Sequence, residues 1–297
     1  RGDLMSATET TLPDIQPLPV KPDWPEAARH IMRWWAGEGP IVAISAPADT
    51  PWFDAGEPAP PPDLPTRWLD PTYRARRAEY QAVTTWFGGD RVPEPRCLVG
   101  AGDLGAFIGC DYGFAETTCW FEPCIDDLGA HPPIRFDPAN ANFRAIYDLL
   151  AEAQRVAAGR YLIGLPDLVE NFDILAAMMG PEQSLYAAVD QPDEVAERME
   201  QINQAYFAAY DAFYDLLADE HGCVVFDAFD LWGPGKVAKV QCDAAAILSP
   251  DLFERLVVPA LTRQCDWLDL SMYHLDGEDA LVHLDSLLAI EPLHRSE

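Results

Sequence analysis

Short apolar runs alternate with longer amphipathic segments through the second half of this chain. Residues 161–165, 223–226 and 268–273 are apolar runs of strand length, and residues 192–217 carry their apolar side chains on one helical face. Strands that alternate with helices in this way are typical of a parallel sheet covered by helices. The pattern therefore predicts an α/β architecture.

Capping and breaking residues set the expected helix boundaries. Asp137 and Pro138 are the expected cap and first residue of one helix, because a side-chain oxygen satisfies free backbone N–H groups there. A buried strand is expected at residues 41–44, and the Pro-rich loop that follows it, residues 47–65, is expected to overhang the site. The predicted helices cover residues 24–35, 70–87, 137–159, 192–217 and a segment that begins after Ser249-Pro250 and kinks at Pro259.

The length and composition suit one large core. With 297 residues, 49% of them hydrophobic, the chain is long enough for a single barrel-sized domain, which we expect over residues 26–297. Residues 1–25, rich in Pro, Thr and Asp, are expected to form a flexible lead-in. They lack the basic and then apolar build of a signal peptide, and the chain has no apolar run of about 18 residues.

The charge limits the possible partners. The formal net charge is −29 at pH 7, and Lys21, Lys236 and Lys239 are the only lysines. This acidic surface repels phosphate groups and anionic lipid, so nucleic acid and membrane are not expected partners. The seven cysteines lack the paired spacing of a disulfide framework, which indicates a cytoplasmic protein. Cys119 and Cys124 are interpreted as buried or loop thiols, because no second close pair completes a zinc site.

The segment at residues 270–277, Leu-Ser-Met-Tyr-His-Leu-Asp-Gly, ends a strand-like run with His274 and Asp276. Their side chains lie on one side of an extended chain, and Gly277 allows the sharp turn that follows. The carboxyl ends of parallel strands surround the active site in α/β barrels. We therefore expect this pair to bind a metal, share a proton or bind a substrate. The alternative is that His274 only orients the loop by a hydrogen bond to Asp276 or to a backbone group.

Further candidates follow other predicted strands. Buried carboxylates at strand ends can act as general acids or bases, and a lysine in a Gly-Pro-Gly loop can pair with a substrate anion. Asp also caps helices and turns, so a structural role stays open for each carboxylate. The candidates are Asp230 as a catalytic residue, and Asp167, Asp227, Trp232, Lys236, Asp243 and Tyr273 as substrate-binding residues.

Four stretches of the sequence are distinctive in their order: residues 247–259 (Ile-Leu-Ser-Pro-Asp-Leu-Phe-Glu-Arg-Leu-Val-Val-Pro), 164–167 with 173–175, 190–193, and 229–233. They resemble landmarks of the uroporphyrinogen decarboxylase superfamily. The resemblance is best over residues 161–288, and it implies a (β/α)8 TIM barrel. Family barrels continue beyond the segment that matches residues 270–277, so this barrel is expected to lack its last C-terminal units, through truncation or because a partner, such as a second copy, completes it.

The resemblance also bears on the reaction. Corrinoid and coenzyme M methyltransferases of the superfamily carry His-x-Cys-Gly at this strand and bind zinc there, whereas true decarboxylases carry Lys-Asp-Gly and use no metal. This chain has His274-Leu-Asp276-Gly277 and shares one residue with each branch. Likeness to the methyltransferases implies zinc held by His274, Asp276 and Cys242, a small-molecule substrate, and a corrinoid methyl donor on a partner protein.

Charge separates the two reactions. Residues 46–49 (Ala-Pro-Ala-Asp), which follow the first predicted strand, contain no arginine cluster, and the excess negative charge opposes a polyanionic porphyrinogen. The leading hypothesis is therefore a metal-assisted methyl or one-carbon transferase. One alternative is a metal-free decarboxylase (a lyase) of a porphyrinogen-like or smaller carboxylic acid, with Asp276 stabilising positive charge. The other alternative is a non-catalytic binding or accessory subunit.

Overall fold

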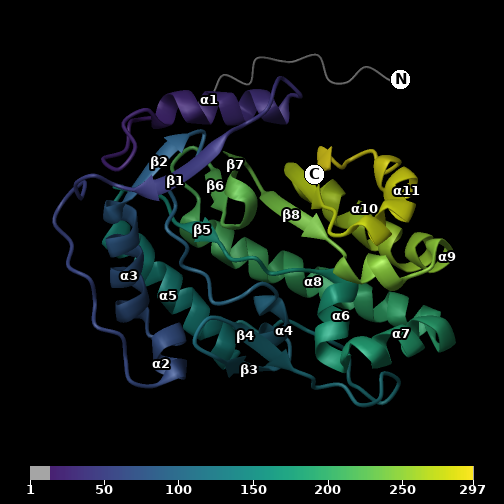
Figure 1. Cartoon of the computed structure of the whole chain (residues 1–297). Helices are drawn as coiled ribbons and strands as arrows, with labels where there is room; N and C mark the ends of the chain where they lie inside the picture. Colours follow the sequence, from purple (N-terminus) through teal and green to yellow (C-terminus); the bar gives the residue numbers. More distant parts are fainter. Residues whose placement is uncertain (1–13, 297) are drawn as a thin grey trace.

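A computed structural model describes residues 14–296 and has a mixed α/β fold (Figure 1). Short strands lie in the middle of the view and helices surround them. This arrangement confirms the α/β class that the alternating pattern predicts.

The first described elements combine three helices with a two-stranded ribbon. They are α1 (Trp24–Trp35), β1 (Ala43–Pro47), α2 (Leu64–Leu69), α3 (Pro71–Thr84) and β2 (Thr85–Gly89). The prediction of a helix over residues 24–35 is confirmed by α1. β1 pairs antiparallel with β2 alone, and Ile44 is 45% exposed. The expected buried strand is therefore wrong, because a two-stranded ribbon leaves side chains in solvent.

The Pro-rich loop at residues 47–65 runs down the outer side of α3 (Figure 1). Trp52 donates its indole N–H to the Thr85 carbonyl at 2.8 Å, and the Arg160 guanidinium packs over the Phe53 ring at 4.4 Å. These contacts hold the loop against this side of the molecule. The expectation that it overhangs the strand ends is therefore wrong.

Of the predicted lead-in, residues 1–13 lie outside the described residues. Within the described part, Val20 and Lys21 are buried. The Lys21 ammonium donates to the carbonyls of Phe87 and Gly89 at 2.9 and 2.8 Å and pairs with Asp23 at 3.2 Å. A buried ammonium with these partners ties the segment to β2.

Helices make up most of the middle of the chain. α8 confirms the helix predicted over residues 192–217. The helix predicted from Asp137 begins later, because the Asn140 side chain accepts the first free N–H groups, whereas the Asp137 carboxylate closes a turn with Ala139. The elements are α4 (Asp103–Phe107), β3 (Asp111–Phe114), β4 (Cys119–Glu122), α5 (Ala141–Ala157), β5 (Gly164–Leu165), α6 (Asn171–Met179), α7 (Pro181–Asp190) and α8 (Pro192–Leu217).

The central strands form two small sheets. The first contains β5, β6 (Cys223–Phe226) and β7 (Leu231–Pro234), and the second contains β8 (Val237–Gln241), β9 (Leu270–His274) and β10 (Arg295–Ser296). β6 confirms the strand predicted at residues 223–226. β8, β9 and β10 are parallel, as are β5 and β6, but β7 runs antiparallel to β6. A (β/α)8 barrel has only parallel strands, and the described strands do not form a closed barrel, so the fold departs here from the expected architecture.

The C-terminal part consists of short helical segments. The Ser249 hydroxyl accepts the Leu252 N–H and caps α9 (Pro250–Leu252), as predicted. A π-helical turn lies directly before Pro259, where the missing backbone N–H disfavours a regular α-helix. The segments are η2 (Asp243–Ile247), α9 (Pro250–Leu252), η3 (Phe253–Val257), α10 (Val258–Trp267), η4 (Glu278–His283) and α11 (Leu284–Leu288).

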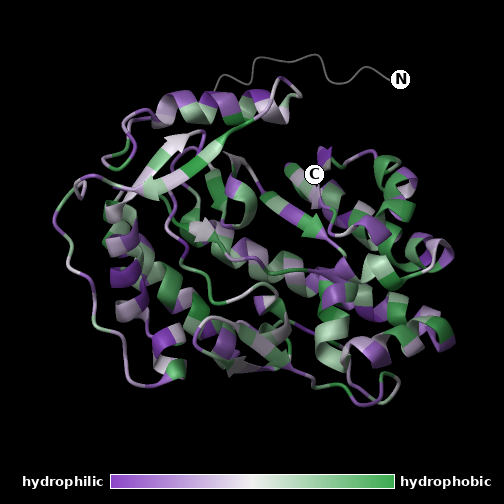
Figure 2. Ribbon diagram, viewed as in Figure 1, coloured by the Kyte–Doolittle hydropathy of each residue, from purple (hydrophilic) through white to green (hydrophobic). Residues whose placement is uncertain are grey.

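The long helix α8 packs its apolar side into the core. Val195, Met199, Ile202 and Phe213 are fully buried on this face. Hydrophilic and hydrophobic residues alternate around the outer helices, as expected for helices that cover a core on one side (Figure 2). No helix among the described residues has the length and apolar character needed to cross a membrane.

Candidate metal and substrate site

The candidate site lies where β8 and β9 end. The two strands are parallel, and their register places Gln241 beside His274. Asp243 follows the end of β8 by two residues, and Asp276 follows His274 by two residues. Because parallel strands end at the same edge, their polar side chains converge there.

Asp243, His274 and Asp276 form a possible metal-ligand group. One ligand atom of each lies within 4.8 Å of the others. The imidazole is half-buried and both aspartates are exposed. Zinc accepts imidazole nitrogen and carboxylate oxygen as ligands, at about 2.0–2.2 Å. The residues therefore fit a divalent cation such as zinc, with modest side-chain movement.

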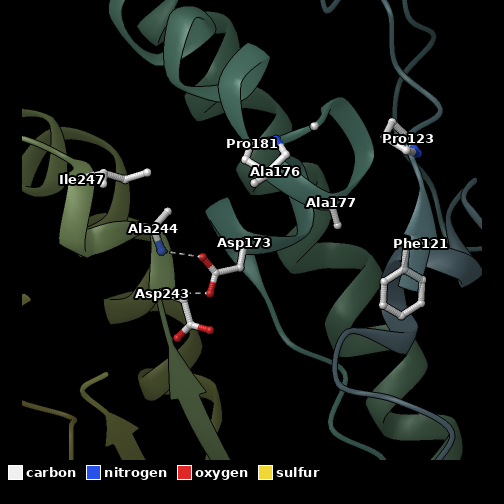
Figure 3. A pocket seen from close by; sticks show the side chains of 10 residues that line it. Phe121, Pro123, Asp173, Ala176, Ala177, Pro181, Asp243, Ala244 and Ile247 are labelled. Atoms are coloured by element: carbon white, nitrogen blue, oxygen red, sulfur yellow. Dashed lines mark hydrogen bonds between the residues drawn. The ribbon is translucent and has the colours of Figure 1, made fainter. Parts of the chain in front are cut away.

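The Asp173 carboxylate, in the first turn of α6, fixes the Asp243 loop (Figure 3). It accepts the backbone N–H groups of Asp243 and Ala244 at 2.8 and 3.1 Å, and the Gln241 side-chain amide at 3.1 Å. Although Asp243 is exposed as a whole, partial desolvation of its carboxyl group and the nearby Asp173 charge raise its pKa, while Lys239 and His274 oppose the rise. Asp173 was not among the predicted site residues, because no local sequence feature shows that α6 meets the end of β8.

Phe229 bounds the site beside His274. The two ring centroids lie 4.6 Å apart, with the rings tilted by 42°. Phe229 and Asp230 both have left-handed backbone conformations, with φ of 65° and 57°. Residues other than glycine rarely adopt this backbone conformation, and such strain often accompanies functional sites. The strained turn after β6 thus presents an aromatic ring to the imidazole.

Asp243, one of the three residues of the metal-ligand group, also lines a cavity of about 410 Å³ (Figure 3). Its walls are mostly apolar, and Asp173 and Asp243 make one side acidic. A volume of this order suits a small molecule. The lining residues are Phe121, Pro123, Asp173, Ala176, Ala177, Gly180, Pro181, Asp243, Ala244 and Ile247.

A buried polar network lies beneath the site. The Lys239 ammonium pairs with Asp167 at 2.9 Å and donates to the Gln241 side chain. The Glu170 carboxyl accepts the Gln241 backbone N–H, and burial raises the pKa of Glu170 to about 8 against the opposing Lys239 charge. Asp167, a predicted substrate-binding residue, therefore has a buried ionic partner.

A buried acidic pair, Asp227 and Glu94, lies at the end of β6. Burial raises the pKa of Asp227 to about 7, although the Arg96 Nε lies 3.9 Å from its carboxylate. Burial and the Asp227 charge also raise the pKa of Glu94. Of these groups only Asp227 was predicted at a site. Glu94 lies in a Pro-flanked segment with no strand pattern, so the sequence gives no signal for it.

Five further predicted residues have other surroundings. Trp232 is buried against the Trp24 ring, with centroids 5.3 Å apart, and Tyr273 is also buried. Lys236 precedes β8, at the opposite end from Asp243, and pairs with Asp211 at 2.7 Å, so it is not part of this site. Asp230 forms an ion pair with Arg91. Cys242 lies outside the metal-ligand group, whose third member is its neighbour Asp243. Burial raises the pKa of the Cys242 thiol.

No protein-family profile matches this chain, and no curated protein sequence matches it. Solved structures, in contrast, match this chain in fold. The chain is similar in fold to a methyltransferase from Methanosarcina mazei. The two share 13% sequence identity, the match covers 91% of this chain and 75% of that chain, and the TM-score is 0.60. At this identity the likeness concerns the fold.

Proposed function

We propose that this protein is an enzyme related to the uroporphyrinogen decarboxylase superfamily that transfers a methyl or other one-carbon group on a small molecule. Asp243, His274 and Asp276 would hold a divalent cation, with zinc as the first candidate. The observation that carries the proposal is the convergence of these three side chains, within 4.8 Å, beside a cavity of small-molecule size. The fold similarity to a methyltransferase supports it.

The chain's own residues have distinct roles in this proposal. The cation, when bound, supplies Lewis acidity that makes a thiol or water nucleophilic near neutral pH. Asp173 holds the Asp243 loop, and the Phe229 ring limits the orientations of the His274 imidazole. Carboxylate and imidazole ligands bind a cation only in the deprotonated form, so zinc affinity should fall on acidification, and the raised pKa of Asp243 moves this loss to higher pH. A corrinoid on a partner protein stays the proposed methyl donor.

Equilibrium dialysis against zinc tests the site. Asp243→Asn, His274→Ala and Asp276→Asn should each weaken zinc binding by at least about tenfold, because each removes a ligand. The matched control is Asp279→Asn, an exposed acid in η4 outside the group, which should bind like the unsubstituted protein. Binding that is insensitive to all three ligand substitutions would refute the site.

Methyl transfer is tested separately. Free methylcobalamin serves as donor and a series of small thiols as acceptors, and loss of the methylcobalamin absorbance reports the transfer. The zinc-loaded protein should catalyse the loss and its His274→Ala variant should not. Equal rates with the two proteins would contradict a role for this imidazole.

A metal-free decarboxylase is the second candidate, favoured by the Glu94–Asp227 pair. Burial raises the pKa of both groups, to about 7 for Asp227, and a carboxyl group that titrates near neutral pH can deliver the proton that replaces lost carbon dioxide. Carbon dioxide release from a small carboxylic acid, undiminished by a chelator and abolished by Asp227→Asn, would favour this reaction over methyl transfer.

A further inference from the structure

Two cysteines meet at the base of the β3–β4 hairpin. Cys110 directly precedes β3, and Cys124 follows the end of β4 by two residues. The hairpin register pairs Asp111 with Glu122, so both cysteines lie just outside the paired strands. Their sulfur atoms are 3.6 Å apart. A disulfide requires about 2.05 Å, a change that small side-chain rotations can provide.

Backbone hydrogen bonds hold both cysteines in position. The Cys110 N–H donates to the Gly105 carbonyl at 2.9 Å, and the Cys124 N–H donates to the Met178 carbonyl at 2.8 Å. A Cβ on residue 109 would lie 3.3 Å from the Cys124 sulfur, so Gly109 leaves room for this close approach. The proximity of the thiols is thus a property of the folded backbone.

The two thiols differ in accessibility and acidity. Cys110 is 1% exposed, whereas Cys124 is partly exposed. The hydrogen bond between the two sulfur atoms lowers the pKa of Cys124 and raises that of Cys110. A partly exposed thiol with a lowered pKa is the one that attacks an oxidant, and a buried neighbour is suited to resolve the product.

We propose that Cys110 and Cys124 are a redox-active pair that forms a reversible disulfide with a low-molecular-weight disulfide as oxidant. The Cys124 thiolate attacks one oxidant sulfur, which breaks the oxidant S–S bond, releases one small thiolate and leaves a mixed disulfide on Cys124. The Cys110 thiol loses its proton and attacks the Cys124 sulfur, releasing the second small thiolate. Two protein thiols are oxidised, one small disulfide is reduced to two thiols, and the protons pass to these products.

The disulfide would lie in the wall of the cavity described above. Phe121 and Pro123, on the strand that leads to Cys124, line this cavity, as do Ala176 and Ala177 just before Met178. Oxidation would covalently join the start and end of the hairpin and fix the position of this wall. The proposal does not depend on methyl transfer or on a bound metal.

Thiol counting after equilibration with oxidised and reduced glutathione tests the pair. The protein is denatured, alkylated and analysed by peptide mass spectrometry. In oxidised glutathione, two of the seven thiols should be protected, with a cross-linked peptide that joins Cys110 to Cys124. Reduced glutathione should restore all seven. A full set of free thiols in oxidised glutathione, or a link through another cysteine, would overturn the proposal.

Single substitutions separate the roles of the two thiols. Cys110→Ser should accumulate a glutathione adduct on Cys124, and Cys124→Ser should form neither adduct nor cross-link at Cys110. The matched control is Cys119→Ser, which removes another partly exposed hairpin thiol, whose sulfur donates to the Val99 carbonyl at 3.4 Å. This variant should keep the cross-link. Loss of the cross-link in the control would contradict the pairing, and the peptide map of the unsubstituted protein keeps the test valid if a variant does not fold.

Discussion

Replacing Asp173 by alanine should weaken both the fold and the proposed metal site. The substitution removes the acceptor of three hydrogen bonds, from Gln241, Asp243 and Ala244, that measure 2.8 to 3.1 Å. At a partly exposed site each contributes about 1 kcal/mol, less than the roughly 1.5–3 kcal/mol of a well-buried hydrogen bond to a charged group. Relief of the repulsion between Asp173 and Asp243 offsets part of this loss. We expect a net destabilisation of roughly 2 kcal/mol.

The same substitution frees the Asp243 loop and removes a negative charge beside the site. Residues that orient a metal ligand typically contribute about ten- to a hundredfold to metal affinity, and we expect a loss of this size for zinc. Urea unfolding with a chelator present measures the first effect, and calorimetric zinc titration measures the second. Asp190→Ala, which removes an exposed acid at the end of α7, is the control and should change neither. Unchanged zinc affinity in Asp173→Ala would refute the role given to this carboxylate.

Three further predictions concern pH, backbone conformation and a buried ammonium. The pKa of Asp227 is raised to about 7 in the folded protein. The stabilisation by its protonated form is therefore fully present below the pKa that Asp227 has in the unfolded chain, and it is lost as the pH rises through about 7. Asp227→Asn should therefore reduce the fall in unfolding free energy between pH 5 and 8, by at most about 1.4 kcal/mol per pH unit, and an unchanged slope in urea titrations would contradict this. Ala158, which follows α5, has a left-handed φ of 47°, a conformation that glycine adopts with less strain. Ala158→Gly should therefore raise the free energy of unfolding by about 1 kcal/mol in a urea titration, and a lower free energy would contradict the strain argument. Lys21→Met should cost about 2 kcal/mol in the same titration, because the buried Phe87 carbonyl and the part-buried Gly89 carbonyl lose their donor; a loss within error would mean that solvent replaces it.

The sequence predicts the elements that have strong, regular patterns. The apolar stripe of α8, the apolar spacing of α1 and the apolar run of β6 each identify their element from local residues alone. The placement of His274 at a strand end follows in the same way. These features depend on side-chain periodicity, which is local.

Other features depend on contacts that the local sequence does not contain. The sequence of β7 predicts a loop because it includes Gly233 and Pro234. The sequence of β8 does not predict a buried strand because it contains Lys239, whose burial depends on the ion pair with Asp167 after the end of β5. The sequence therefore does not predict the antiparallel pairing of β6 with β7. Asp243 rather than Cys242 joins His274 because Asp173, 70 residues earlier, fixes the direction of the loop.

X-ray absorption at the zinc edge of the zinc-loaded protein tests the proposed metal site most directly. We predict a first shell of nitrogen and oxygen only, at about 2.0–2.2 Å, with an imidazole contribution that His274→Ala removes. A sulfur neighbour at about 2.3 Å would instead identify Cys242 or another thiol as a ligand. That result, or a spectrum that His274→Ala leaves unchanged, would contradict a site built from Asp243, His274 and Asp276.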